Sequence, residues 1–244
     1  MIVKCISVVV CAVCFLYTFY VLCNLTYFLS NHEEKETASS LETGEEDESV
    51  LWQLIVNMSL LSAFMLQHTL MASDFLKQLF YKLHMDYMER SIYNAASATS
   101  LHLLLSQWQT ITAISLWKID TSSNDTLWFA FTGIHVLAWL IIYSGCLMMD
   151  ISELTGLKQV YYKFSSRPNP LVMKSRELQR YYSHMRHPSF TGFLIILWIH
   201  PYMTLDRVLL ASILSVYMAL MWSIDKEDYN YHASLVRMKQ RELF

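Results

Sequence analysis

Long apolar runs alternate with short polar segments along this chain. Four of the runs are long enough for a helix that crosses the roughly 30 Å apolar core of a bilayer, which takes about 20 residues. They are Cys5 to Phe28, Leu51 to Met71, Ser91 to Trp117 and Leu127 to Met149. We therefore predict a membrane-spanning helix from each of these runs.

A fifth apolar region, from Ser189 to Ile224, is too long for one span. Its roughly 36 residues would form about 54 Å of helix at about 1.5 Å per residue. Pro201 lacks a backbone donor, and Asp206 and Arg207 are costly at the lipid centre but can pair with each other at an interface. The region is therefore predicted to form two short spans, with a turn between His200 and Arg207.

The basic residues support this count of six spans. Cytoplasmic loops of membrane proteins carry an excess of lysine and arginine. With six spans, all of the 18 lysines and arginines fall on one side except Lys35, Lys118 and Arg207. Both termini are therefore predicted to face the cytoplasm, or the nucleoplasm that nuclear pores join to it.

Composition agrees with a membrane protein, because 54% of the residues are hydrophobic and only 16% are charged. The predicted fold class is all-α: a polytopic membrane helical bundle of about six transmembrane helices, with a short final helical hairpin and an interfacial loop. Residues 1–30 are expected to form a transmembrane anchor and residues 31–49 an acidic, disordered lumenal loop. Residues 50–244 are expected to form the helical membrane core with a basic C-terminal tail.

The loop from Asp150 to Arg180 carries an amphipathic pattern on the predicted cytoplasmic side. Apolar residues recur at roughly helical spacing beside Lys158 and Lys163, at Leu154, Leu157, Val160, Tyr161 and Phe164. This pattern is typical of a helix that lies in the membrane interface.

Polar chemistry within the apolar runs is limited to a few residue types. His68, His102, His135 and His200 come from four different spans, and they either meet in the bundle interior or make separate interhelical hydrogen bonds. The five cysteines all lie in apolar runs, so no disulfide framework is expected. Asn124 begins a glycosylation sequence, NDT, but it lies almost against the fourth span.

The stretch SHMRHPSFTGF, from Ser183 to Phe193, places concentrated polar chemistry before an apolar run. Arg186 supplies a forked donor, His187 a titratable ring, and the following proline suits a first helical turn. Such a corner can hold a ligand carboxylate, although Arg186 can also bind lipid head groups together with nearby arginines. His184 and His187 lack a further ligand pattern, so no metal site is expected.

At these residues the chain resembles a known superfamily. RHPSFTG is similar to the Arg-His-Pro-aromatic-x-Gly pattern of the isoprenylcysteine carboxyl methyltransferase family. Over nearly its whole length the chain resembles the nurim family of inner nuclear membrane proteins within that superfamily, through QHTLMAS, SELTGLKQVYY, SHMRHP, DRVLLA and DKEDYNY.

The resemblance implies a methyltransferase-like membrane core over residues 50–244, with S-adenosylmethionine as the cofactor. It assigns cofactor binding to the following residues: His184, Arg186, His187 and Glu227. The enzymes usually show two consecutive glutamates after the last span, whereas this chain has Asp225, Lys226, Glu227 and Asp228 there. The chain departs from the catalytic pattern at this point.

Two functions are therefore expected. The first is a nurim-like role at the nuclear envelope without demonstrated chemistry, as a multi-pass protein of the inner nuclear membrane, which is continuous with the endoplasmic reticulum. Its expected partners are membrane lipids and the nuclear lamina or chromatin, without sequence-specific recognition of nucleic acid. The alternative is an S-adenosylmethionine-dependent methyltransferase that acts on a lipid or a prenylated carboxylate.

The six-span topology predicts the outcome of cysteine labelling in sealed membranes. A thiol introduced between residues 31 and 49 should react only with a reagent in the lumen, and one introduced after Asp228 only with a reagent on the cytoplasmic side. Labelling of both positions from the same side would contradict the five spans predicted between them, because an odd number of spans places the two positions on opposite sides.

Overall fold

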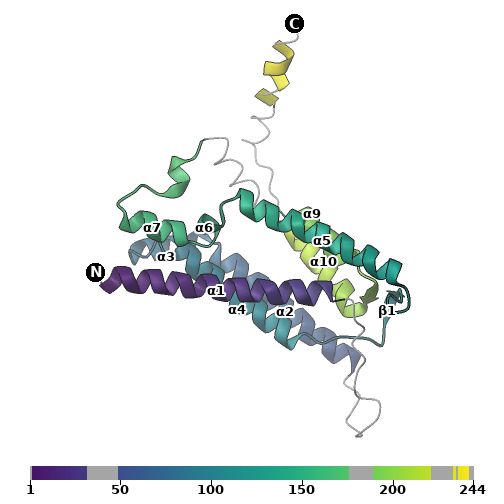
Figure 1. Ribbon diagram of the computed structural model, residues 1–244. Helices are drawn as coiled ribbons and strands as arrows, with labels where there is room; N and C mark the ends of the chain where they lie inside the picture. The colour runs from purple at the N-terminus through teal and green to yellow at the C-terminus, as the bar shows by residue number, and fades with distance from the viewer. Residues whose placement is uncertain (1, 32–48, 176–188, 221–232, 235, 242–244) are drawn as a thin grey trace.

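The computed structural model describes residues 2–31, 49–175, 189–220, 233–234 and 236–241. Most of these residues are helical, and the helices lie side by side in a bundle with two short strands at one end (Figure 1). The elements in chain order are α1 (Ile2–Ser30), α2 (Val50–Met71), α3 (Asp74–Lys82), α4 (Glu89–Gln107), β1 (Ser115–Lys118), α5 (Asp125–Met148), α6 (Ile151–Leu154), α7 (Leu157–Phe164), η1 (Pro170–Met173), α9 (Phe190–Trp198), β2 (Tyr202–Thr204) and α10 (Leu205–Leu220).

Within the described part of the chain, three helices are long and apolar enough to cross a membrane. They comprise Lys4–Ser30 within α1, all of α2 and all of α5. Most of their side chains face outward, as lipid-facing side chains do. The predicted all-α membrane fold is therefore confirmed, while the count of six spans stays a prediction: α9 has 9 residues, or about 14 Å of helix, less than half of a bilayer core.

The expected span from Ser91 to Trp117 was wrong in its second half. The helix ends at Gln107, and the chain continues to β1, which pairs antiparallel with β2. Asn57 on α2 explains the end of the helix, because its amide donates to the carbonyl oxygen of Gln109 at 2.7 Å and accepts from the Gln109 N–H at 2.9 Å. These long-range bonds replace the hydrogen bonds that a longer helix would make internally.

The predicted final hairpin is confirmed. α9 ends at Trp198, β2 occupies the turn, and α10 begins at Leu205. The carbonyl oxygen of Pro201 accepts from the Ile119 N–H at 2.9 Å, so this turn is tied to the residue that follows β1. Asp206 and Arg207 lie in the first turn of α10 as expected, but their side chains bond to other groups, as described below.

α9 packs very closely on α5 at Gly192. A Cβ atom at this position would lie 2.7 Å from Cγ1 of Ile142 and 2.8 Å from the carbonyl oxygen of Ala138. Ser189 reinforces the contact, since its hydroxyl donates to the carbonyl oxygen of Ile142 at 3.1 Å. Small residues allow such close approach between membrane helices. Gly192 therefore sets how deeply the final hairpin docks on the bundle.

We expect Gly192→Ala to destabilise the protein by about 1–3 kcal/mol, because the added methyl group overpacks the contact between α5 and α9. Gly133→Ala on α5 is the matched control. A Cβ atom at Gly133 meets nothing within 4 Å, and alanine is the better helix former by about 1 kcal/mol. Thermal unfolding of the purified variants measures both effects. Equal unfolding temperatures for Gly192→Ala and the unchanged protein would contradict the packing constraint.

Candidate functional site

The residues that the sequence assigned to a cofactor lie outside the described part of the chain. His184, Arg186 and His187 fall within residues 176–188, and Glu227 falls within residues 221–232. The role of these four residues in binding a cofactor stays a prediction.

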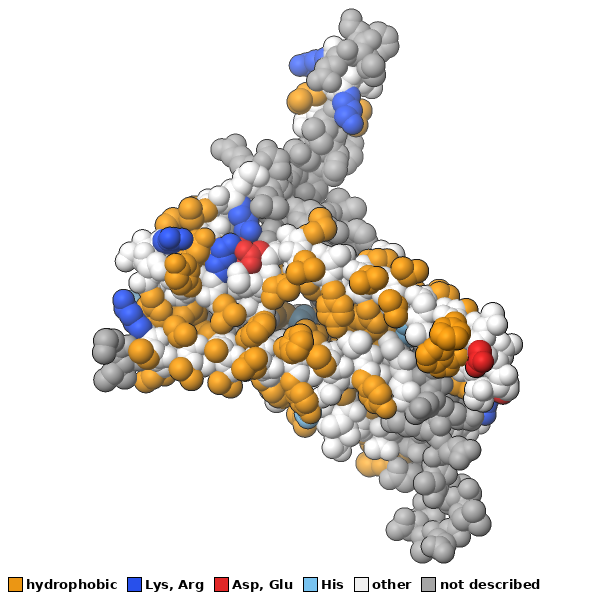
Figure 2. Space-filling view, in the orientation of Figure 1, with side chains coloured by type: hydrophobic (Ala, Val, Ile, Leu, Met, Phe, Trp, Pro, Cys, Tyr) orange, Lys and Arg blue, Asp and Glu red, His pale blue; other side chains and the backbone are white. Residues whose placement is uncertain are grey.

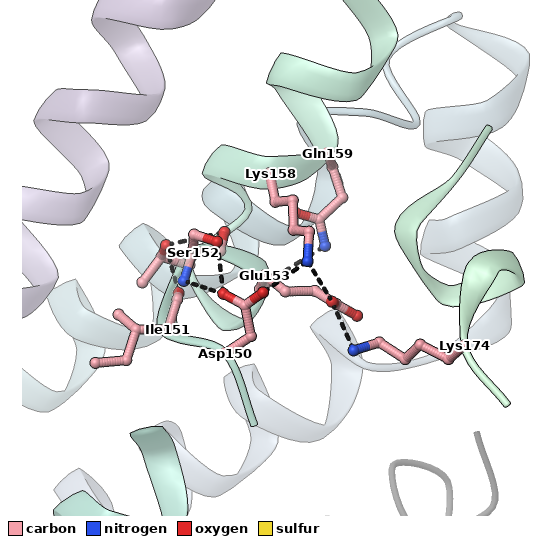
Figure 3. Close-up of polar contacts among 8 residues, drawn as sticks. Asp150, Ile151, Ser152, Glu153, Lys158, Gln159 and Lys174 are labelled. Atoms are coloured by element: carbon pink, nitrogen blue, oxygen red, sulfur yellow. Dashed lines mark hydrogen bonds and ion pairs between the residues drawn. The ribbon is translucent and has the colours of Figure 1, made fainter. Parts of the chain in front are cut away.

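A described polar cluster lies beside the end of α5, at the bundle end that carries α6 and α7 (Figure 3). Asp150 directly precedes α6 and accepts from the backbone N–H of Ser152 at 3.1 Å and from its hydroxyl at 2.6 Å. Lys158 on α7 donates to the second carboxylate oxygen of Asp150 at 2.6 Å. Asp150 thus caps one short helix and binds the next.

These contacts change the acidity of both partners. The hydrogen bond from Lys158, followed by the one from Ser152, lowers the pKa of Asp150 from its ordinary value of 3.8 to about 2. The bond with Asp150 raises the pKa of Lys158. Because the pKa of Asp150 lies below its ordinary value, its contribution to stability is present above about pH 4 and is lost as the pH falls toward 2.

Glu153 is the buried member of the cluster, with 5% of its surface exposed. Its carboxylate lies 2.9 Å from the ammonium of Lys174 and 3.8 Å from that of Lys158 (Figure 3). The side chain of Gln159 donates to its backbone carbonyl oxygen at 3.0 Å. A buried carboxylate is stable only when its charge is paired. Glu153 therefore holds Lys174, just after η1, against α6 and α7.

α4 supplies the support on which this cluster rests. Ser91 donates to the carbonyl oxygen of Thr155 at 3.1 Å, and Asn94 donates to that of Leu154 at 2.8 Å. Gly156 follows with φ of 88°, and a Cβ atom there would lie 2.7 Å from the backbone nitrogen of Ser91. Glycine tolerates both the left-handed conformation and the close approach. The segment from α6 to α7 is thus fixed to α4 by hydrogen bonds and packing.

The interfacial helix expected between Asp150 and Arg180 takes a different form in the structure. α6 and α7 are two short helices separated at Gly156, and the apolar side of α7 packs within the protein. Its inward side chains Leu157, Val160 and Phe164 contact a cluster that includes Cys11 and Met88. The helical spacing was predicted correctly, but its apolar face is covered by α1 and by the residues before α4.

α3 is the amphipathic helix that the sequence analysis missed. Phe75, Leu79 and Leu83 recur every four residues and are 72%, 42% and 58% exposed. Lys77 and Lys82 lie on the same short helix. An exposed apolar face on a short helix that also carries lysines is typical of a helix in the membrane interface. The signal for this helix is present in SDFLKQLFYKL, where apolar residues recur every four positions.

Two of the four histidines meet, at the end of the bundle opposite to α7. The rings of His135 and His200 are 5.9 Å apart between centroids. His135 lies 3.1 Å from the hydroxyl of Ser30 and donates to the carbonyl oxygen of Ile199 at 2.8 Å. His200 donates to the carbonyl oxygen of Asn31 at 3.1 Å. This pair fixes the end of α1 to α5 and to the final hairpin.

The other two histidines are separate. His68 on α2 lies 2.9 Å from the hydroxyl of Tyr93 on α4. The ring of His102 lies between Tyr17 and Tyr20, with centroids 6.3 and 5.9 Å away. His68 and His102 thus make separate interhelical contacts. Among the described residues, no group of three or more metal-ligating side chains comes together.

Figure 2 shows Lys and Arg side chains at the bundle end that carries α6 and α7, and a second group on the C-terminal segment of residues 236–241. Lys4 lies 5.5 Å from the centre of the Phe164 ring, and Lys163 lies 5.6 Å from the centre of the Tyr87 ring. Such cation–π contacts hold lysine stems against aromatic surface. The start of α1 therefore lies at the same end as α7. Figure 2 also shows a broad apolar surface along the bundle, as membrane contact requires.

The apolar spans and the polar clusters at both ends define a multi-pass α-helical membrane protein. The chain belongs to the nurim family. It is 39% identical to the Nurim homolog of Drosophila pseudoobscura pseudoobscura, over 93% of this chain and 92% of that protein. It is 35% identical to the Nurim homolog of Drosophila melanogaster, with coverage of 94% and 92%, and 35% identical to Nurim of Bos taurus, with coverage of 80% and 74%.

Two further comparisons found no match. No protein-family model matches the chain. No solved structure matches it either.

Glu153→Gln should lower the free energy of unfolding by about 1–3 kcal/mol, because it leaves the ammonium of Lys174 without its buried carboxylate. Lys77→Gln is the control, since it breaks an exposed ion pair with Asp74 that contributes at most about 0.5 kcal/mol. Thermal unfolding gives the stability, and hydrogen exchange locates the change. Unaltered exchange in α6 and α7 of Glu153→Gln would show that Glu153 does not hold this segment.

Proposed function

We propose that this chain is an anchored structural protein of the inner nuclear membrane, which is continuous with the endoplasmic reticulum membrane. Membership in the nurim family supports this location. The observation that carries the proposal is the basic end of the bundle, defined here as the end with α3, α6 and α7. Under this proposal the basic end faces the nucleoplasm, and the segment of residues 31–49 faces the lumen.

The two ends of the described bundle differ in their basic side chains. The basic end carries Lys4, Lys77, Lys82, Arg90, Lys158, Lys163, Arg167 and Lys174. The opposite end carries Lys118 in β1 and Arg207 in α10. An excess of lysine and arginine marks the cytoplasmic side of membrane proteins. For a protein of the nuclear envelope, this side is the nucleoplasm.

α3 provides the contact with the membrane surface at this end. Its exposed Phe75 and Leu79 enter the interface, while Lys77 and Lys82 stay near the head groups. Each basic residue near anionic lipid contributes about 1 kcal/mol of attraction. The same positive surface attracts acidic partners such as the lamina or chromatin without reading a base sequence. Anchoring therefore rests on insertion and charge, and it requires no cofactor.

Photobleaching of a fluorescent fusion tests the proposal. The unchanged protein should be retained at the nuclear rim, survive detergent extraction that releases ordinary reticulum proteins, and recover slowly. Lys77→Gln combined with Lys82→Gln should recover faster, because about 2 kcal/mol of attraction to acidic surfaces is removed. Lys118→Gln, at an exposed residue of the opposite end, is the control and should recover at the unchanged rate.

Free diffusion of the unchanged protein throughout the reticulum would overturn the anchoring role. Equal recovery of the double variant and the unchanged protein would show instead that α3 is not the anchoring element. Both readouts require variants that fold, which a normal unfolding temperature in purified protein establishes.

A further inference from the structure

A cavity of about 480 Å³ lies at the end of the bundle opposite to the basic end. The last turns of α1 and α4, the two strands and the first turn of α10 form its walls. This volume lies within the roughly 300–1,000 Å³ of small-molecule sites. The cavity is separate from the cluster around Glu153 and shares no residue with it.

One wall contains the buried carboxylate of Asp206, and both of its oxygens accept hydrogen bonds from the protein. Asp206 is 2% exposed. One of its oxygens accepts from the indole N–H of Trp108 at 2.9 Å, and the other accepts from the backbone N–H of Ile111 at 3.1 Å. Asp206 is therefore a structural acceptor that fixes the residues after α4. Its neighbour Arg207 makes no ion pair with it, since no carboxylate of the described residues lies within ion-pair distance of the Arg207 guanidinium; the two charges attract each other only at longer range.

Arg207 carries more donors than the described residues satisfy. A guanidinium has five N–H groups, and that of Arg207 makes one hydrogen bond, to the carbonyl oxygen of Phe28 at 3.3 Å. Arg207 lines the cavity, as does His102, whose buried Nδ1 atom has no hydrogen-bond partner among the described residues. A guanidinium held this way presents a positive charge and a planar set of donors to the cavity, which suits carboxylate or phosphate.

The remaining walls favour an anion attached to an apolar body. Aromatic rings line the cavity at Tyr27, Phe28, Trp108, Trp117 and Tyr202. The rings of Phe28 and Trp108 meet edge to face with centroids 6.2 Å apart, next to Arg207. Ligand sites commonly combine such apolar walls with a few polar groups that fix orientation.

We propose that this cavity binds an amphiphilic organic anion, a carboxylate or phosphate carried on an apolar body, with Arg207 as the residue that binds the charged group. The anion is either the head group of a membrane lipid or a soluble metabolite. The proposal is independent of nuclear anchoring, which rests on the opposite end of the bundle. Failure of one therefore leaves the other standing.

Calorimetric titration of the full-length protein in phosphatidylcholine nanodiscs tests the site. The probes are dodecyl phosphate, dodecanoate and inorganic phosphate, with dodecanol as the uncharged control and empty nanodiscs as the blank. We expect saturable binding of at least one amphiphilic anion and none of dodecanol. Competition by inorganic phosphate would indicate a soluble source of the anion, whereas binding of the amphiphiles alone would indicate a lipid.

Substitutions distinguish the contribution of the Arg207 charge to binding from that of the cavity volume. Arg207→Gln should weaken binding about tenfold or more, because charge-assisted bonds are lost. Arg207→Lys should bind less tightly than the unchanged protein, because lysine lacks the fork. Ser106→Phe fills the cavity from α4 without changing its charge, and it should also weaken binding. Arg237→Gln removes a described, exposed arginine outside the cavity and should bind normally.

The absence of saturable binding for all three anionic probes would overturn the proposal. It would equally be overturned if Arg207→Lys and Ser106→Phe, with normal unfolding temperatures, bound the amphiphiles as tightly as the unchanged protein. These two variants keep the test valid even if Arg207→Gln fails to fold.

Discussion

The buried carboxylate of Asp206 is the constraint on which the strand-bearing end of the bundle depends. Its two oxygens are taken by Trp108 and Ile111, which lie just beyond α4. An ion buried this deeply persists only where it is fully hydrogen-bonded. Because these bonds hold Trp108 and Ile111 outside the helix, the chain ends α4 before them and continues to β1, which pairs with β2. They also place Arg207 beside a cavity with its charge uncompensated by a direct partner.

The basic end also contains a buried carboxylate, but different groups stabilise its charge. Glu153 is also buried, but lysines rather than neutral donors surround its carboxylate. The positive charges of Lys158 and Lys174 are thus partly used inside the protein, while those on α3 stay exposed. One end of the molecule consequently has internal charge pairing beneath a basic surface. The other has a cavity lined by Arg207 and Lys118, and no ion pair of the described residues involves Arg207.

Local composition predicted the elements whose structure is decided locally. The apolar runs that became α2 and α5 are long enough to show in any window of sequence, and Pro201 with Asp206 and Arg207 indicated the final turn. The end of α4 was beyond such reasoning, because Asn57 and Asp206 act on it from distant parts of the chain. Burial of the apolar face of α7 was hidden for the same reason, since Cys11 and Met88 cover it from other elements.

The candidate site divides in a similar way. Sequence alone singled out His135 and His200 as polar residues at membrane depth, but their meeting depends on how α5 and the final hairpin dock. The cavity beside Arg207 could not be foreseen, because its walls come from five elements. Adjacency in the sequence predicts a pair between Arg207 and Asp206, whereas in the fold the carboxylate of Asp206 accepts hydrogen bonds from Trp108 and Ile111.

The contacts that His135 and His200 make with the end of α1 have a consequence for biosynthesis. Ser30 and Asn31 are bonded to His135 and His200, residues that emerge from the ribosome long after the first helix has entered the membrane. N-terminal segments are made and inserted first, so α1 enters the lipid before the residues that contact its end have been synthesised. These contacts form only after the final hairpin has been inserted. The end of the first helix therefore reaches its final contacts only after the chain has been made as far as His200, which donates to the backbone carbonyl of Asn31.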